Sequence, residues 1–268
     1  MEHTNLTPKF GAELALGTQL VDFNDDDISA LKNLAAERGV IVARNQNMCV
    51  QSQVDFGHRL GTLMKSPANK PGVPEELILI QAGPKSKAVA GEKWHSDVSS
   101  EAVPPGLSML RMEVVPMSGG DTLFADMYQA FEMLSDAMQA FVKQLTARHV
   151  PRGHYLYISG KKRLDELPSN VHPVVRTHPL TGRNALYVND GFVDKIIELR
   201  RKESDGLLAI LYNHIAYSVA AQCRVQWEPD TVVFWDNRVV QHHAAFDYYP
   251  DVRRGYRATV VGEEPYLA

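Results

Sequence analysis

The chain is dominated by short apolar runs with the length of strands, and few stretches are long enough to form a helix. The runs at 40–43 and 231–235 are rich in β-branched and aromatic residues, which favours buried strands. Further strands are predicted at 77–81, 107–115, 174–177, 185–188, 224–227 and 258–262. Because no repeat or linker divides its 268 residues, the chain is predicted to form one α+β domain around a barrel or jelly roll.

Helices are predicted early and in the middle of the chain, at 25–39, 51–60, 127–145 and 202–216. The first has Asp25, Asp26 and Asp27 at its electrically positive N-terminus and Gly39 at its end. The third shows apolar residues at helical spacing, namely Phe131, Leu134, Met138 and Phe141.

The composition argues against several classes of protein. A net charge of -4 provides no general attraction to nucleic acid or to an anionic membrane, so neither is expected as a partner. The two cysteines, Cys49 and Cys223, are far apart, which argues against a disulfide framework or a structural zinc site. We expect no signal peptide, and no membrane span because no run approaches about 18 apolar residues. A reducing cytoplasm is the predicted setting.

The tetrapeptide Trp94-His95-Ser96-Asp97 places an imidazole and a carboxylate two residues apart. On a β-strand, both of these side chains would point to the same face. They would supply two of the three ligands of the 2-His-1-carboxylate site that holds non-haem Fe(II). With 10 His and 32 acidic residues in the chain, such pairs arise by chance, and the spacing alone favours a solvated strand edge or a histidine oriented by its neighbour over a metal site.

A third ligand is available near the other end of the chain, where Gln241 is followed by His242 and His243. Either histidine suits the chemistry. Neighbours on a strand face opposite ways, so only one of them is expected to join His95 and Asp97.

An arginine cluster follows at Arg253, Arg254 and Arg257. If 253–260 forms a strand, Arg253 and Arg257 share a face. Two inward guanidinium groups would bind carboxylate, sulfonate or sulfate oxygens in bidentate fashion. The alternative is an exposed basic patch on an edge strand.

Several sequence blocks resemble, in order and spacing, the taurine dioxygenase (TauD/TfdA) family of Fe(II)- and 2-oxoglutarate-dependent oxygenases. The resemblance runs from about residue 10 to the C-terminus. It implies a double-stranded β-helix (jelly-roll) core with flanking helices, in a single domain over 1–268. The blocks are Trp94 to Val98, Gly119 to Leu123, His172 to Pro179, Val188 to Phe192, Trp235 to Arg238 with Gln241-His242, and Arg253 to Thr259.

The resemblance also implies a role for each matching residue. His95, Asp97 and His242 would be the catalytic metal ligands, which selects His242 over His243. Thr122 and Arg253 would bind the distal carboxylate of 2-oxoglutarate.

Substrate contacts are implied at further matching positions. Arg257 would bind an anionic group of the substrate, and Val98 and Phe192 would line the substrate pocket. Trp94 and Trp235 are further candidates for the lining. For these four apolar residues, plain core packing is an equal alternative.

The implied reaction uses Fe(II), 2-oxoglutarate and O2, and releases succinate and CO2. The substrate would be a small organic anion such as an alkyl sulfonate, an alkyl sulfate or an aryloxyalkanoate, hydroxylated with or without C–S, C–O or ether cleavage. Ser66 and Asn69 stand where the taurine enzymes carry His and Tyr, and Ser99-Ser100 replaces a more usual Thr-Phe, which argues against taurine itself. The family also suggests a homo-oligomer, and the polar segment 85–93 is predicted to form a lid.

Three alternatives remain open at this point. The first is desaturation or another oxidative tailoring step with the same cofactors. The second is a zinc hydrolase built on His95, Asp97 and His242. The third is a binding barrel without catalytic activity.

Overall fold

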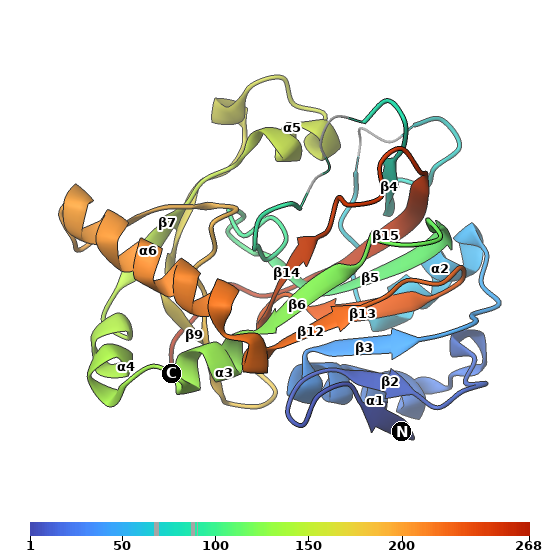
Figure 1. Cartoon of the computed structure of the whole chain (residues 1–268), viewed down its shortest axis with the longest axis horizontal. Coiled ribbons are helices and arrows are strands. Elements are labelled where there is room, and N and C mark those ends of the chain that lie inside the picture. The colour runs from blue at the N-terminus through green and yellow to red at the C-terminus, as the bar shows by residue number, and fades with distance from the viewer. Residues whose placement is uncertain (67–69, 87–88, 90) are drawn as a thin grey trace.

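The protein has a mixed α/β fold with a seven-stranded sheet at its centre (Figure 1). The structure is a computed structural model that describes residues 1–66, 70–86, 89 and 91–268. The strand order of the large sheet is β1-β2-β3-β13-β5-β15-β4. Its strands are β1 (His3–Asn5), β2 (Ala12–Leu14), β3 (Val40–Ala43), β4 (Leu77–Ala82), β5 (Pro105–Val114), β13 (Val232–Asp236) and β15 (Arg253–Val261).

The central strands of this sheet are buried on both faces, which explains why they read as continuous apolar runs. In β3, Val40 and Val42 belong to the core on one face, whereas Ile41 belongs to the core on the other. In β13, Trp235 and Phe234 divide in the same way. Helices cover the face that carries Ile41 and Phe234, whereas Trp235, on the opposite face, also borders a cavity.

Three smaller sheets complete the strand structure. One has the order β12-β6-β14 and pairs antiparallel throughout, one has the order β11-β7-β8, and one is the hairpin β9-β10. Their strands are β6 (Thr122–Asp126), β7 (Thr146–His149), β8 (Asn170–Pro173), β9 (Val175–Thr177), β10 (Asn184–Leu186), β11 (Val193–Ile196), β12 (Gln222–Val225) and β14 (Val240–Ala244).

The helices lie around these sheets. Contacts join α1 to β3 and β13, and α2 to β15, so these two helices cover the outer face of the large sheet, while α6 packs on β11 (Figure 1). The helices are α1 (Asp25–Arg38), α2 (Val50–Leu60), α3 (Met127–Glu132), α4 (Asp136–Val142), α5 (Gly153–Ser159) and α6 (Arg201–Tyr217), with short 3-10 turns at Leu20–Asp22, Leu164–Glu166 and Val219–Ala221. No helix in the described ranges is long and apolar enough to cross a membrane.

The prediction of a single helix at 127–145 is wrong. The structure has two short helices, α3 and α4, followed by strand β7 from Thr146. Ser135 ends the continuity because its side chain accepts a hydrogen bond from the Met138 N–H and caps a new helix. Phe141, the last residue of the apolar spacing on which that prediction was based, is 42% exposed.

Most other predicted elements are confirmed, with shifts at their ends. The strand predicted at 224–227 runs over Gln222–Val225, and the hairpin partner predicted at 185–188 runs over Asn184–Leu186. The strand predicted at 258–262 is longer and begins at Arg253, so Arg253 and Arg257 lie on one strand.

Candidate metal centre and its cavity

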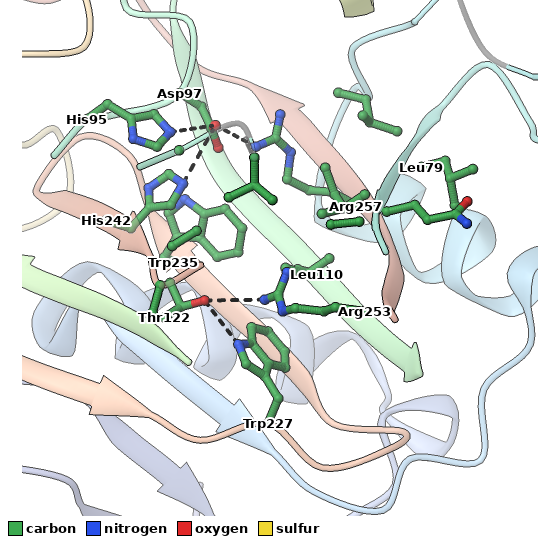
Figure 2. Close-up of a pocket in the computed structure, with 18 of the residues that line it drawn as sticks. Leu79, His95, Asp97, Leu110, Thr122, Trp227, Trp235, His242, Arg253 and Arg257 are labelled. Atoms are coloured by element: carbon green, nitrogen blue, oxygen red, sulfur yellow. Dashed lines mark hydrogen bonds and ion pairs between the residues drawn. The ribbon is translucent and has the colours of Figure 1, made fainter. Parts of the chain in front are cut away.

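A cavity of about 420 Å³ lies between the large sheet and the three-stranded sheet β12-β6-β14. Its walls come from β4, β5, β13 and β15 on one side and from β6 and β14 on the other (Figure 2). All eight predicted site residues line this cavity, namely His95, Asp97, Val98, Thr122, Phe192, His242, Arg253 and Arg257.

His95 and His242 face each other across a short backbone bridge. The His95 N–H donates to the His242 carbonyl at 3.1 Å, and the His242 N–H donates to the His95 carbonyl at 2.9 Å. The two imidazole rings are 4.1 Å apart between centroids. The expectation that His95 and Asp97 share a strand is wrong, because His95 sits in this isolated bridge and Asp97 begins a turn.

Asp97 is held in place by one side chain from strand β5 and one from the turn after β13. Its N–H donates to Asn237 Oδ1 at 3.1 Å, and Ser108 Oγ donates to Asp97 Oδ2 at 3.0 Å. Asn237 Nδ2 in turn donates to Ser108 Oγ at 2.9 Å. Val98 has a φ of 32°, a left-handed conformation that is strained for a β-branched residue and turns the chain sharply after Asp97. One oxygen of the carboxylate is thereby fixed, and the other faces the histidines.

The three predicted ligands form a compact buried cluster whose ligand atoms all lie within 4.8 Å of one another. Asp97 Oδ1 is 4.0 Å from His95 Nε2 and 3.9 Å from His242 Nε2. His95 Nδ1 lies 2.7 Å from the Lys93 carbonyl, to which it can only donate, so its Nε2 carries the lone pair that a metal needs. Two imidazoles and one carboxylate converging in this way fit a divalent transition metal and leave further coordination positions open.

The protonation states also suit metal binding. Burial lowers the pKa of His95 and, more strongly, that of His242, so both are neutral at pH 7. Burial alone would raise the pKa of the Asp97 carboxyl, but Arg257 and the two histidines outweigh it and lower this pKa to about 2. The cluster therefore offers two neutral imidazoles and one carboxylate without a need to release protons.

The other end of the cavity holds a buried arginine. Arg253 is 6% exposed, and its guanidinium lies over the Trp227 ring at 5.4 Å and 3.5 Å from Thr122 Oγ1. Trp227 Nε1 donates to the same Thr122 hydroxyl at 3.0 Å (Figure 2). Within the described ranges Arg253 has no carboxylate partner, and its Nε lacks any hydrogen bond. A buried, unpaired guanidinium is costly unless an anion binds to it, so this end of the cavity suits a carboxylate.

Arg257 lies on the same strand as Arg253, and its guanidinium reaches the metal end of the cavity (Figure 2). Its Nη1 is 2.5 Å from Asp97 Oδ1, the carboxylate oxygen that faces the histidines. The third arginine of this strand, Arg254, does not line the cavity, and its Nε lies 3.4 Å from Glu113 Oε2. The prediction that Arg253 and Arg257 share an inward face is confirmed, and the alternative of an exposed basic patch is wrong for these two residues.

Three of the four apolar residues predicted to line the substrate pocket border the cavity. Val98, Phe192 and Trp235 line the cavity. Trp94 does not belong to this lining and contacts the His243 ring instead, with 5.7 Å between centroids. Ser66 lines a neighbouring cavity that shares Val98 and Arg257 with the first, whereas Asn69 and residues 87, 88 and 90 of the predicted lid lie outside the described residues.

Three contributors to the site were missed by the sequence reasoning. Ser108 and Asn237 hold Asp97, and Trp227 holds Thr122 and covers Arg253. Asn237 could have been suspected, because it lies within the Trp235 to Arg238 block. Ser108 and Trp227 carry no local signal, since only tertiary contacts bring them to the site.

Comparison with known proteins assigns the family. Residues 2–259 match the model of the taurine catabolism dioxygenase TauD, TfdA family. The chain belongs to this family. An alpha-ketoglutarate-dependent sulfonate dioxygenase of Saccharomyces cerevisiae is 37% identical over 97% of this chain, which spans 66% of that relative's length. An alpha-ketoglutarate-dependent sulfate ester dioxygenase of Pseudomonas putida is 31% identical over 96% of this chain and 88% of its own.

Solved structures agree with this assignment. A taurine dioxygenase from Burkholderia xenovorans superposes with a TM-score of 0.86 at 30% identity, covering 99% of this chain and 92% of its own. Family membership implies Fe(II) as the metal, with 2-oxoglutarate and O2 as co-substrates. The donor set of His95, Asp97 and His242 fits such an ion.

Proposed function

We propose that the protein is an Fe(II)- and 2-oxoglutarate-dependent dioxygenase that oxidises a small organosulfur anion, a sulfonate or a sulfate ester. The observation that carries the proposal is one cavity with a 2-His-1-carboxylate cluster at one end and, at the other, a buried arginine that has no carboxylate partner among the described residues. The names of the yeast and Pseudomonas relatives support the substrate class. In this proposal the chain is a single dioxygenase domain with a double-stranded β-helix core, formed by the two sheets that enclose the cavity.

The residues divide the work as follows. His95, Asp97 and His242 hold the metal, which, when bound, supplies the activation of O2 that couples decarboxylation of 2-oxoglutarate to substrate oxidation. Arg253 and Thr122 bind the distal carboxylate of 2-oxoglutarate, and the Trp227 ring shields that ion pair from water.

Arg257 binds the anionic group of the substrate, beside the metal ligands. Val98 and Phe192 are apolar walls that exclude water and restrict the orientation of the carbon to be oxidised. The protein thus contributes positioning and a dry site, while the oxidative chemistry belongs to the cofactor.

The zinc hydrolase alternative uses the same three ligands but provides no role for Arg253 and Thr122. A buried guanidinium without a counter-ion is explained by a dicarboxylate co-substrate and by nothing in a hydrolytic mechanism. Desaturation and other oxidative outcomes share the whole site and differ only in the product. The predicted cytoplasmic setting and homo-oligomer stay predictions from the sequence.

The proposal is tested by oxygen consumption and succinate release with Fe(II), 2-oxoglutarate and a panel of alkyl sulfonates, alkyl sulfates and aryloxy acids. Succinate is expected in amounts equal to the oxidised substrate for at least one sulfonate or sulfate ester. The His242→Ala variant should be inactive, whereas His243→Ala, which changes the neighbour on the other face, should keep turnover. Equal activity of these two variants would reject the proposal, and so would conversion of the substrate to product in the absence of oxygen.

A further inference from the structure

A separate cavity of about 260 Å³ lies behind the two histidines of the metal cluster. It is bounded by the segment 92–94, Asp190, the C-terminal half of α6 and strand β14, and it shares no lining residue with the metal cavity. Its volume is that of roughly eight or nine water molecules, enough for a small organic molecule.

This rear cavity faces the opposite side of the backbone bridge that carries the histidines. His95 and His242 point into the metal cavity, while their chain neighbours Trp94 and His243 line the rear cavity. Side chains of successive extended residues alternate between faces, so each cavity receives one member of each pair.

Three buried polar atoms on its lining residues have no hydrogen-bond partner among the residues that the structure describes. These atoms are Gln241 Oε1, His243 Nδ1 and Tyr212 Oη. Gln241 is 1% exposed, and its Nε2 donates to the Val188 carbonyl at 2.6 Å, which fixes the amide so that the oxygen is the unused atom. Unpaired buried polar groups are costly, and such groups around one cavity indicate a ligand that would satisfy them.

The electrostatics of the cavity favour a cation. Tyr212 and Ala216 belong to the last two turns of α6, a helix of 17 residues whose C-terminal end carries partial negative charge. At the rim, Lys93 is neutralised by Asp190 at 2.9 Å, and Glu92 has no ion-pair partner in the part of the chain that the structure describes. The Trp94 ring adds an aromatic face of the kind that binds cations.

We propose that the rear cavity binds a small organic ammonium ion. The ammonium N–H groups would donate to Gln241 Oε1 and Tyr212 Oη, with the carbon chain against Trp94 and Ile215. Burial raises the pKa of the Tyr212 hydroxyl, so it stays a neutral hydrogen-bond partner at physiological pH. This site stands independently of the proposed dioxygenase activity, because it uses none of the metal-binding or anion-binding side chains.

The test is calorimetric titration of the full chain with ethylammonium chloride at constant ionic strength, with sodium chloride and ethanol as charge and shape controls. Saturable binding of ethylammonium alone is expected, and an excess of 2-oxoglutarate should not displace it. The Tyr212→Phe variant should weaken binding roughly tenfold to hundredfold, the effect of losing one hydrogen bond to a charged group. Tyr217→Phe, on the exposed end of the same helix, should bind as the unmodified protein does.

A second variant keeps the result interpretable if Tyr212→Phe perturbs the core. Glu92 is exposed at the rim, and Glu92→Gln should weaken binding severalfold without affecting the fold. Absence of saturable binding would overturn the proposal. So would equal binding of ethanol, displacement by 2-oxoglutarate, or unchanged affinity in both Tyr212→Phe and Glu92→Gln.

Discussion

Replacement of Ser108 by alanine tests how the protein holds its carboxylate ligand. Ser108 Oγ donates to Asp97 Oδ2 at 3.0 Å and accepts from Asn237 Nδ2 at 2.9 Å, all within a buried site. Without the hydroxyl, Asn237 Nδ2 keeps its bond to the Gly106 carbonyl at 3.1 Å, but Asp97 Oδ2 loses the hydrogen bond that Ser108 donates from the sheet. Asp97 is then free to rotate toward Arg257.

The size of the effect follows from this one lost contact. A hydrogen bond to a charged group contributes about 1.5–3 kcal/mol, which corresponds to a factor of roughly 10 to 150 in affinity. Loss of an outer partner of a metal ligand commonly costs about 10–100-fold in metal affinity. We therefore expect Ser108→Ala to bind Fe(II) or Mn(II) about 10–100-fold more weakly.

The assay is anaerobic metal titration of the metal-free protein, with urea unfolding as a parallel measure of stability. Ser204→Ala is the matched control, because Ser204 is fully buried and its hydroxyl accepts the Ile196 N–H at 2.8 Å, far from the metal ligands in the sequence. Both variants should lose unfolding free energy, but only Ser108→Ala should lose metal affinity. Equal metal affinity in the two variants would refute the reasoning.

Two further predictions concern the arginines of the cavity, and a third concerns the buried His149. Arg253→Ala should raise the apparent KM for 2-oxoglutarate far more than that for substrate, since removal of a buried ion-pair partner costs about 3–5 kcal/mol; an unchanged KM for 2-oxoglutarate in steady-state assays would contradict the assignment. Arg257→Ala should weaken binding of anionic substrates selectively, and equal loss for neutral analogues would count against its role. Burial lowers the pKa of His149 well below 6.5, so the unfolded chain binds the additional proton and the unfolding free energy falls as pH drops below about 6.5. The slope should reach about 1.4 kcal/mol per pH unit for this group and should decrease in His149→Phe, as measured by urea unfolding of the metal-free protein; an unchanged slope would argue against it.

The fold was predictable where local pattern and burial agree. The runs that became β3 and β13 are apolar because both faces of these strands are buried. One face packs in the core beneath the helices, and the other packs in the core on the opposite side of the sheet. The helix predicted at 127–145 failed because the cap at Ser135 outweighs an apolar spacing that continues through Phe141. Spacing alone does not show whether a helix is interrupted.

The candidate site was predictable only in part, for the same reason. The chain pattern named His95, Asp97 and two possible partners, His242 and His243, and the choice of His242 rested on the family resemblance. The register of the bridge supplies the physical reason, because it turns the His242 imidazole inward. That register depends on contacts between residues far apart in the sequence, such as Asp97 with Asn237, which are 140 positions apart. Ser108 and Trp227 could not be named from local sequence, since their roles exist only in the folded chain.

If Arg257 binds the substrate anion as proposed, its pairing with Asp97 makes the metal and the substrate partners in heterotropic linkage. The same Asp97 oxygen is 2.5 Å from the Arg257 guanidinium and about 4 Å from the Nε2 atoms of His95 and His242. A metal bound to this oxygen would compete with Arg257 for it, and the two positive charges would repel each other. An anion that binds Arg257 relieves that repulsion and should tighten metal binding. By reciprocity, the metal should tighten anion binding by the same factor, which metal titrations with and without propanesulfonate would measure. Such coupling would keep the metal affinity low until an anionic substrate binds.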